Sequence, residues 1–202
     1  RLGALESTTA SRLPALLAGF HRACPEVAIE LVTGTNDAMT LAVVNQQVDL
    51  AFVVERPVDD RLDSSPAFRE RLVLIAPHDS PPLRTARDVA GRAVLAFPTG
   101  CAYRRRLERW LGQRRAPSVR TLELGSYHAI VTCVAAGVGI AVVPESVLAV
   151  VSDAQVSRHP LPQAIADVRT CIVWRRNDVP APALALRQWV GRSLPRSASQ
   201  SK

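Results

Sequence analysis

The chain has almost no lysine and few aromatic side chains. Its net charge of +7 comes from arginine, because Lys202 is the only lysine, and its 202 residues include only two tyrosines, three tryptophans and four phenylalanines. Proteins that bind single-stranded nucleic acid combine a basic groove with aromatic side chains on which bases stack. The arginines here are scattered apart from Arg104–Arg106 and two pairs. This pattern favours a solvated basic surface over a nucleic-acid-binding face.

Long apolar runs are also missing. No run approaches the roughly 20 residues that a membrane-spanning helix needs. Residues 1–20 lack the basic start, apolar core and small-residue cleavage site of a secretion signal. We therefore expect a cytoplasmic protein without membrane association. An apolar content of 48% permits one large or two small domains with a real core. Because the chain opens directly on an apolar strand, we expect that its amino terminus was removed or that it is a fragment.

The motifs of metal sites, disulfides and hydrolases are absent. The four cysteines are Cys24, Cys101, Cys133 and Cys171. They are far apart, form no CxxC pair and have no histidine at ligand spacing, so we expect reduced thiols, no metal site and no cofactor. His128 lies close to Ser126, but the sequence has no G-x-S-x-G elbow. Residues 137–139, Gly-Val-Gly, follow a predicted helix and precede a strand, which is the reverse of a dinucleotide-binding loop. The sequence therefore predicts that the protein is not an enzyme.

The stretch that is most informative lies at the start of the chain. A short apolar strand, Leu2–Leu5, is followed at once by the polar residues Glu6–Thr9 and then by an amphipathic helix. The helix is indicated by apolar residues at i, i+3, i+4 and i+7, namely Leu13, Leu16, Leu17 and Phe20. A cap among Ser7–Ser11 places Pro14 in or just after the first turn, where proline is tolerated. Hydroxyls and free N–H groups at a helix start favour an anion, whereas the simpler alternative is that they only cap the helix.

The remaining pattern alternates strands with helices. Predicted strands cover 27–33, 48–54, 62–68, 71–76, 93–97, 119–124, 140–143, 156–159 and 170–175. Predicted helices run from the polar turn 34–37 to Gln47, from the turn 98–101 to Gly112, and over 129–136, 145–151 and 181–194, and residues 196–202 are expected to be disordered. This order is typical of an α/β fold with helices on both faces of the sheets. Ligands of open α/β sheets bind outside the carboxyl ends of strands, so two such units facing each other are expected to form a cleft.

Four stretches resemble the effector-binding domain of LysR-type transcriptional regulators. They are RLGALESTTASRLPALLAGFHRACPEVAIEL (residues 1–31), VDLAFV (48–53), ERLVLIAPHDSPP (70–82) and GSYHAIVTCVAAGVGIAVVPESV (125–147). Their order and spacing carry the resemblance, which covers essentially the whole chain.

The resemblance implies a fold similar to type 2 periplasmic binding proteins, with a small molecule held between two Rossmann-like lobes. Lobe I is expected to comprise residues 1–75 plus 171–202, and lobe II residues 76–170. In the family a winged helix-turn-helix domain precedes this one. It is absent here, so DNA contact is expected only through that missing domain. The family also implies a homodimer or tetramer, with lobes paired antiparallel.

The family's ligand residues carry over only onto the matching turns. The implied ligand-binding residues are Ser7, Thr8, Thr9, Thr35, Thr99, Gly100, Cys101, Tyr103, Ser126 and Tyr127. Hydroxyls and N–H groups in these turns suit a carboxylate or an amino-acid-like anion. The effector is therefore expected to be a small organic acid or a similar molecule that modulates DNA binding by the missing domain.

Two other functions remain open. Peroxide-sensing members of the family place a reactive cysteine in the turn that corresponds to Cys101, and nearby Arg104 and Arg105 favour a thiolate. Those sensors use a second cysteine soon afterwards, and residues 102–120 contain none. The other possibility is a free-standing solute-binding protein of the same fold.

Overall fold

The computed structural model describes residues 1–112, 120–151 and 154–193. They form two compact α/β units, of which the first comprises residues 1–34, 38–69 and 169 onward and the second residues 35–37 and 70–168. The predicted tail at 196–202 and the first residue of the predicted strand 119–124 lie outside the described ranges. No helix within these ranges is long and apolar enough to cross a membrane.

The sheet of the first unit contains both parallel and antiparallel strand pairs. Its strands are β1 (Leu2–Leu5), β2 (Leu31–Gly34), β3 (Leu50–Val54) and β9 (Asp167–Arg175), in the order β2-β1-β3-β9. β1 pairs in parallel with both β2 and β3, and β3 pairs antiparallel with β9. All residues of β1 and β3 are buried, which explains their nearly continuous apolar sequences.

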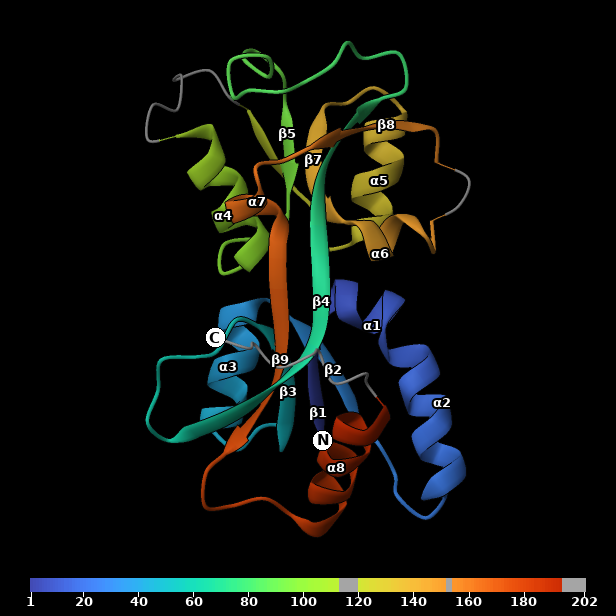
Figure 1. Ribbon diagram of the computed structural model, residues 1–202, viewed down its shortest axis with the longest axis vertical. Coiled ribbons are helices and arrows are strands. Elements are labelled where there is room, and N and C mark those ends of the chain that lie inside the picture. The colour runs from blue at the N-terminus through green and yellow to red at the C-terminus, as the bar shows by residue number, and fades with distance from the viewer. Residues whose placement is uncertain (113–119, 152–153, 194–202) are drawn as a thin grey trace, which may run out of the picture. The chain divides into compact units, whose positions relative to one another are not determined.

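Helices cover both faces of this sheet (Figure 1). They are α1 (Glu6–Ser11), α2 (Leu13–Ala23), α3 (Asn36–Val44) and α8 (Ala181–Ser193). One core lies between the sheet and the pair α2 and α8, and it contains Leu13, Leu16, Phe20, Phe52, Ile172, Leu186 and Val190. The other core lies under α3 and contains Met39, Val43, Val53, Cys171 and Val173. Neighbouring residues of β9 therefore point to opposite faces, as the period of a strand requires.

The second unit has a mixed sheet. Its strands are β4 (Leu62–Pro77), β5 (Val94–Ala96), β6 (Thr121–Glu123), β7 (Ile140–Pro144) and β8 (Val156–Pro160). β5 pairs in parallel with β6 and β7, and β4 pairs antiparallel with β7 and β8. Its helices are α4 (Ala102–Leu111), α5 (Tyr127–Ala135), α6 (Glu145–Leu148) and α7 (Gln163–Ala166). Figure 1 shows α4 and α7 on one face of this sheet and α5 and α6 on the other.

The structure corrects several sequence expectations. The strand predicted at 27–33 is shorter and shifted, because β2 covers only Leu31–Gly34. The single predicted helix near the start is two helices, because α1 ends at Ser11 and α2 begins at Leu13, with Pro14 in its first turn. The strands predicted at 62–68 and 71–76 are one continuous strand, β4, which runs from the first unit into the second. The short helix α7 was not predicted, because four residues are too few for a visible helical period.

A buried histidine fixes the proline-rich connector onto β8. The backbone N–H of Leu83 donates to His159 Nδ1 at 3.1 Å, so the neutral ring carries its proton on Nε2. That Nε2 lies 2.9 Å from Ser157 Oγ, which donates in turn to Pro77 O at 2.9 Å. Burial, and secondarily the charge of Arg92, lower the pKa of His159 below its ordinary value of 6.5.

This network predicts a loss of stability in mild acid. The folded protein binds a proton at His159 less readily than the unfolded chain does, so the stabilisation is complete above pH 6.5 and declines as the pH falls below it. Protonation also removes the acceptor for Leu83 N–H, which is worth about 1 kcal/mol. We expect His159→Asn, which retains an acceptor near Nδ1 but does not titrate, to show a weaker pH dependence of unfolding free energy between pH 5 and 7. Urea unfolding at each pH measures this difference, and parallel curves for the two proteins would contradict it.

Candidate functional site

The three hydroxyl residues that follow the first strand, Ser7–Thr9, lie within a short helix. β1 ends at Leu5, which is itself the N-cap residue of α1, and no side chain caps this helix. Ser7 and Thr8 are buried, and Thr9 follows them in the same turn. The expectation that a residue among Ser7–Ser11 caps the long helix is therefore wrong, because α2 begins after Arg12 and also lacks a side-chain cap.

Two of these hydroxyls are buried without a hydrogen-bond partner. Ser7 is 2% exposed, and neither its Oγ nor the enclosed Oγ1 of Thr9 has a partner among the described residues. Ser11 in the same helix behaves differently, since its Oγ donates to Ser7 O at 2.7 Å. Leaving a buried hydroxyl unpaired costs about 1 to 3 kcal/mol. Capping therefore does not account for Ser7 and Thr9.

Thr35 lies between β2 and α3, as the sequence predicts. It directly precedes Asn36, the first residue of α3, and is half-buried. Residues 35–37 belong to the second unit, although the rest of α3 belongs to the first.

In the second unit, Thr99, Gly100 and Cys101 form the turn between β5 and α4. Gly100 has a φ of +93°, a conformation that favours glycine, and Cys101 N donates to Pro98 O at 3.2 Å. Thr99 is exposed, whereas Cys101 is buried and is the N-cap residue of α4. The sequence therefore located this turn correctly.

Aromatic rings surround Cys101. Its Sγ lies 3.7 Å from the hydroxyl oxygen of Tyr127, and the Tyr127 ring stacks on Phe97 with centroids 4.5 Å apart. Tyr103 contacts Tyr127 at 6.1 Å between centroids. The structure thus brings three predicted site residues, Cys101, Tyr103 and Tyr127, into one buried cluster. All four cysteines of the chain are free thiols.

Ser126 has the capping role that its sequence position indicates. It is the N-cap residue of α5, and its Oγ accepts from Ala129 N at 3.4 Å. This bond occupies the hydroxyl with a local partner, unlike the hydroxyls of Ser7 and Thr9.

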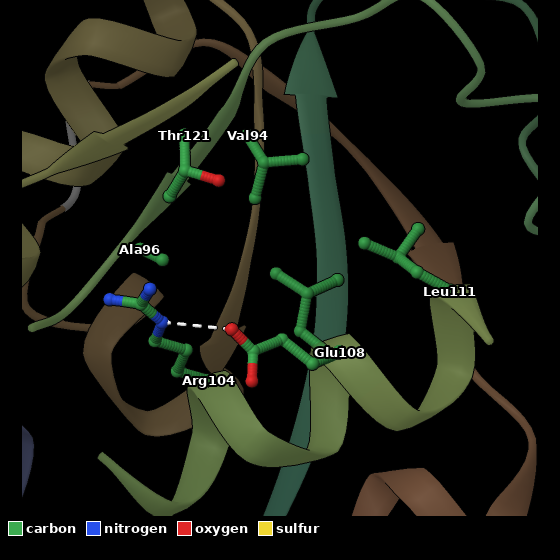
Figure 2. Close-up of a pocket in the computed structure, with 7 residues that line it drawn as sticks. Val94, Ala96, Arg104, Glu108, Leu111 and Thr121 are labelled. Atoms are coloured by element: carbon green, nitrogen blue, oxygen red, sulfur yellow. Dashed lines mark hydrogen bonds and ion pairs between the residues drawn. The ribbon is translucent and has the colours of Figure 1, made fainter. Parts of the chain in front are cut away.

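A hollow lies beside α4 and is lined by residues of β5, α4 and β6 (Figure 2). It has a volume of about 250 Å³, open solvent included, and its lining residues are Val94, Ala96, Arg104, Leu107, Glu108, Leu111 and Thr121. Arg104 donates to Glu108 Oε1 at 3.0 Å and to Glu123 Oε1 at 2.5 Å, and these bonds raise its pKa. Arg104 is therefore engaged by two carboxylates, which satisfies its charge locally.

One buried polar side chain of the first unit was not predicted as a site residue. Thr170, on β9, is fully buried, and its Oγ1 has no hydrogen-bond partner among the described residues. The sequence signal that could have identified it is a threonine within an otherwise apolar strand, because a valine would have the same shape there without a polar atom. Within the described ranges no group of three or more histidine, cysteine or acidic side chains is placed to hold a metal ion.

Comparison with known proteins identifies the family. The family model of the LysR substrate binding domain matches residues 1–195. The chain is 30% identical over 189 residues to the HTH-type transcriptional regulator GltR of Bacillus subtilis (strain 168), covering 92% of the chain and 63% of GltR. It thus spans about three-fifths of the length of this curated relative.

Solved structures confirm the predicted fold class. The regulatory domain of CcmR from Synechocystis PCC6803, in complex with 2-PG, has a TM-score of 0.83 at 22% identity, covering 98% of this chain and 97% of that one. The effector binding domain of QuiR in complex with shikimate has a TM-score of 0.81 at 16% identity, covering 95% of this chain and 94% of that one. The match of the family model over residues 1–195 shows that the chain belongs to the LysR substrate binding domain family.

Proposed function

We propose that the chain is the effector-sensing domain of a LysR-type transcriptional regulator and that its effector is a small organic anion. The observation that carries this proposal is the pair of buried, unpartnered hydroxyls, Ser7 Oγ and Thr9 Oγ1. Both can donate a hydrogen bond to a ligand without first breaking one inside the described part of the protein. Hydrogen bonds to a charged group contribute about 1.5 to 3 kcal/mol each, more than those to a neutral acceptor.

The likeness to effector-bound domains supports a small polar ligand. CcmR is bound to 2-PG and QuiR to shikimate, which is a carboxylate. In this chain the hydroxyls of α1 are the primary recognition set. The turn of Thr99, Gly100 and Cys101, together with Thr35, Tyr103 and Tyr127, supplies the further candidate contacts. Thr8 and Ser126 complete the set, although the hydroxyl of Ser126 already caps α5.

The regulatory step belongs to the longer protein. We propose that a DNA-binding domain outside this chain is coupled to effector binding here, with a coupling free energy of about 1 to 3 kcal/mol. A homodimer or tetramer is the proposed assembly, and the cytoplasm is the proposed compartment. The curated relatives GltR and YusT of Bacillus subtilis (strain 168) are described as HTH-type transcriptional regulators, which supports this role over that of an enzyme. Accordingly, the bound effector is expected to be released unchanged.

A matched panel of acids and amides tests the proposed ligand class. We expect succinate, malate, 2-oxoglutarate, glutamate or shikimate to raise the melting temperature and to bind in titration calorimetry. The neutral partners succinamide and methyl shikimate are expected to bind at least about 10-fold more weakly, because they lack the charge that strengthens each hydrogen bond. Binding of only the neutral compounds would remove the proposal of an anionic effector. A ligand that is converted to a product during the titration would favour an enzyme instead.

A further inference from the structure

Thr170 is a residue of the first unit that no sequence pattern assigned to the site. It lies on β9 directly opposite Val54 of β3, is 0% exposed, and has an Oγ1 with no hydrogen-bond partner in the described part of the chain. A valine would fill the same volume without leaving a polar atom unpaired. The hydroxyl therefore works against stability in the unliganded protein.

Strand alternation places the Thr170 side chain on the face that carries α2 and α8. Its neighbour Cys171 belongs to the core under α3, whereas Ile172 belongs to the core under α2 and α8. Side chains alternate along a strand, so Thr170 shares the face of Ile172. Ala4 of β1 is on the same face, because it belongs to the same core cluster.

The register of the sheet then brings Thr170 level with the start of α1. Ala4 pairs with Phe52 near the end of β1, and Val54, the last residue of β3, pairs with Thr170, so Thr170 lies at the end of the sheet where β1 passes into α1. β3 lies between β1 and β9, and strands lie about 4.8 Å apart, so the backbone of β9 at Thr170 lies about 10 Å from the line of β1. Ser7, whose hydroxyl is also buried and unpartnered, is the second residue of α1. The unpaired hydroxyl residues Ser7 and Thr170 thus both lie at the end of the sheet where β1 and β3 end.

We propose that Thr170 is a specificity-determining residue of the effector site, whose hydroxyl binds a second polar oxygen of the effector. This inference rests on the proposed function, in which Ser7 and Thr9 bind the acid group. The separation of about two strand spacings requires a ligand with polar groups at both ends. The effector class narrows accordingly to hydroxy acids and dicarboxylates, and a monocarboxylate with an apolar remainder is disfavoured.

Two variants distinguish the effect of the Thr170 hydroxyl from the effect of the side-chain shape. Thr170→Val keeps the shape and removes the hydroxyl, whereas Thr170→Ser keeps the hydroxyl and removes a methyl group. We expect Thr170→Val to have a higher urea midpoint than the wild type, because an unpaired buried hydroxyl is gone. Thr170→Ser is expected to have a lower midpoint, because it leaves a small cavity.

Titration calorimetry with malate, succinate and butyrate gives the second readout. Wild type is expected to bind malate or succinate at least about 10-fold more tightly than butyrate, which lacks the second polar end. Thr170→Val is expected to lose this preference, and Thr170→Ser to retain it. Equal preference in wild type and Thr170→Val, or a midpoint of Thr170→Val that does not rise, would overturn the role of Thr170 alone. Failure of all three acids and of the wider panel to bind the wild type would overturn the proposed function as well.

Discussion

Replacing Ser7 with alanine and Thr9 with valine together is expected to weaken effector binding about 100-fold or more. Each hydroxyl bound to a carboxylate contributes about 1.5 to 3 kcal/mol, and about 1.4 kcal/mol corresponds to a factor of ten. The same change is expected to leave the unfolding free energy unchanged or higher, because both hydroxyls are enclosed and have no partner among the described residues. Titration calorimetry with the tightest acid of the panel, together with urea unfolding, measures the two effects.

Ser11→Ala is the matched control for this variant. It also removes a hydroxyl from α1, but that hydroxyl already donates to Ser7 O at 2.7 Å. We therefore expect Ser11→Ala to lower stability slightly and to leave affinity nearly unchanged. If Ser11→Ala weakened binding as much as the double variant, the effect would come from the conformation of the helix and not from contacts to the ligand.

Gly139→Ala is expected to destabilise the second unit by about 3 kcal/mol or more. A Cβ at this position would lie 2.3 Å from Ala93 O and 2.8 Å from Leu95 Cδ1. Ala93 O accepts the hydrogen bond from Ile140 N at 2.9 Å, where β7 begins to pair with β5. Alanine must therefore separate two buried strands, and over-packing of this kind costs typically about 1 to 3 kcal/mol before lost strand pairing is added.

Gly137→Ala separates this steric effect from backbone strain. Gly137 has a φ of +87° at the end of α5, but a Cβ there would meet no atom within 4 Å beyond its own chain neighbours. Its replacement is expected to cost only about 1 to 2 kcal/mol, the strain of a left-handed conformation for alanine. Urea unfolding of the two variants compares them. A Gly139→Ala variant that is no less stable than Gly137→Ala would show that β5 and β7 are not so closely packed at this position.

Much of the fold could be predicted because several of its strands are short, buried and apolar. The sequences of β1, β3 and β7 are nearly continuous apolar runs, and each is buried along its whole length. The end of the helix predicted at 129–136 agrees with α5 to within one residue, because the positive φ that follows a helix is a local requirement that favours a glycine, here Gly137. The close approach of Gly139 to Ala93 depends instead on strand pairing, which no local pattern records.

The sequence indicated candidate site residues only where polar or thiol side chains lie in a turn between a strand and a helix. Cys101 and Tyr127 come from different turns, yet both were selected, and the structure brings them within 3.7 Å. Thr170 was not selected, because the absence of a hydrogen-bond partner within the described residues is a property of packing that the sequence does not record. Ser7 was selected because the family's ligand residues carry over onto its turn, with capping as the simpler alternative, and its burial within α1 without a cap bond is a property of packing.

The central claim is that the buried hydroxyls of α1 bind an anionic effector. A crystal structure of the protein with the tightest acid of the panel tests it most directly. We predict an acid oxygen within about 3.2 Å of both Ser7 Oγ and Thr9 Oγ1, the range of ordinary hydrogen bonds. An acid that is bound elsewhere, with neither hydroxyl in contact with it, would contradict the account.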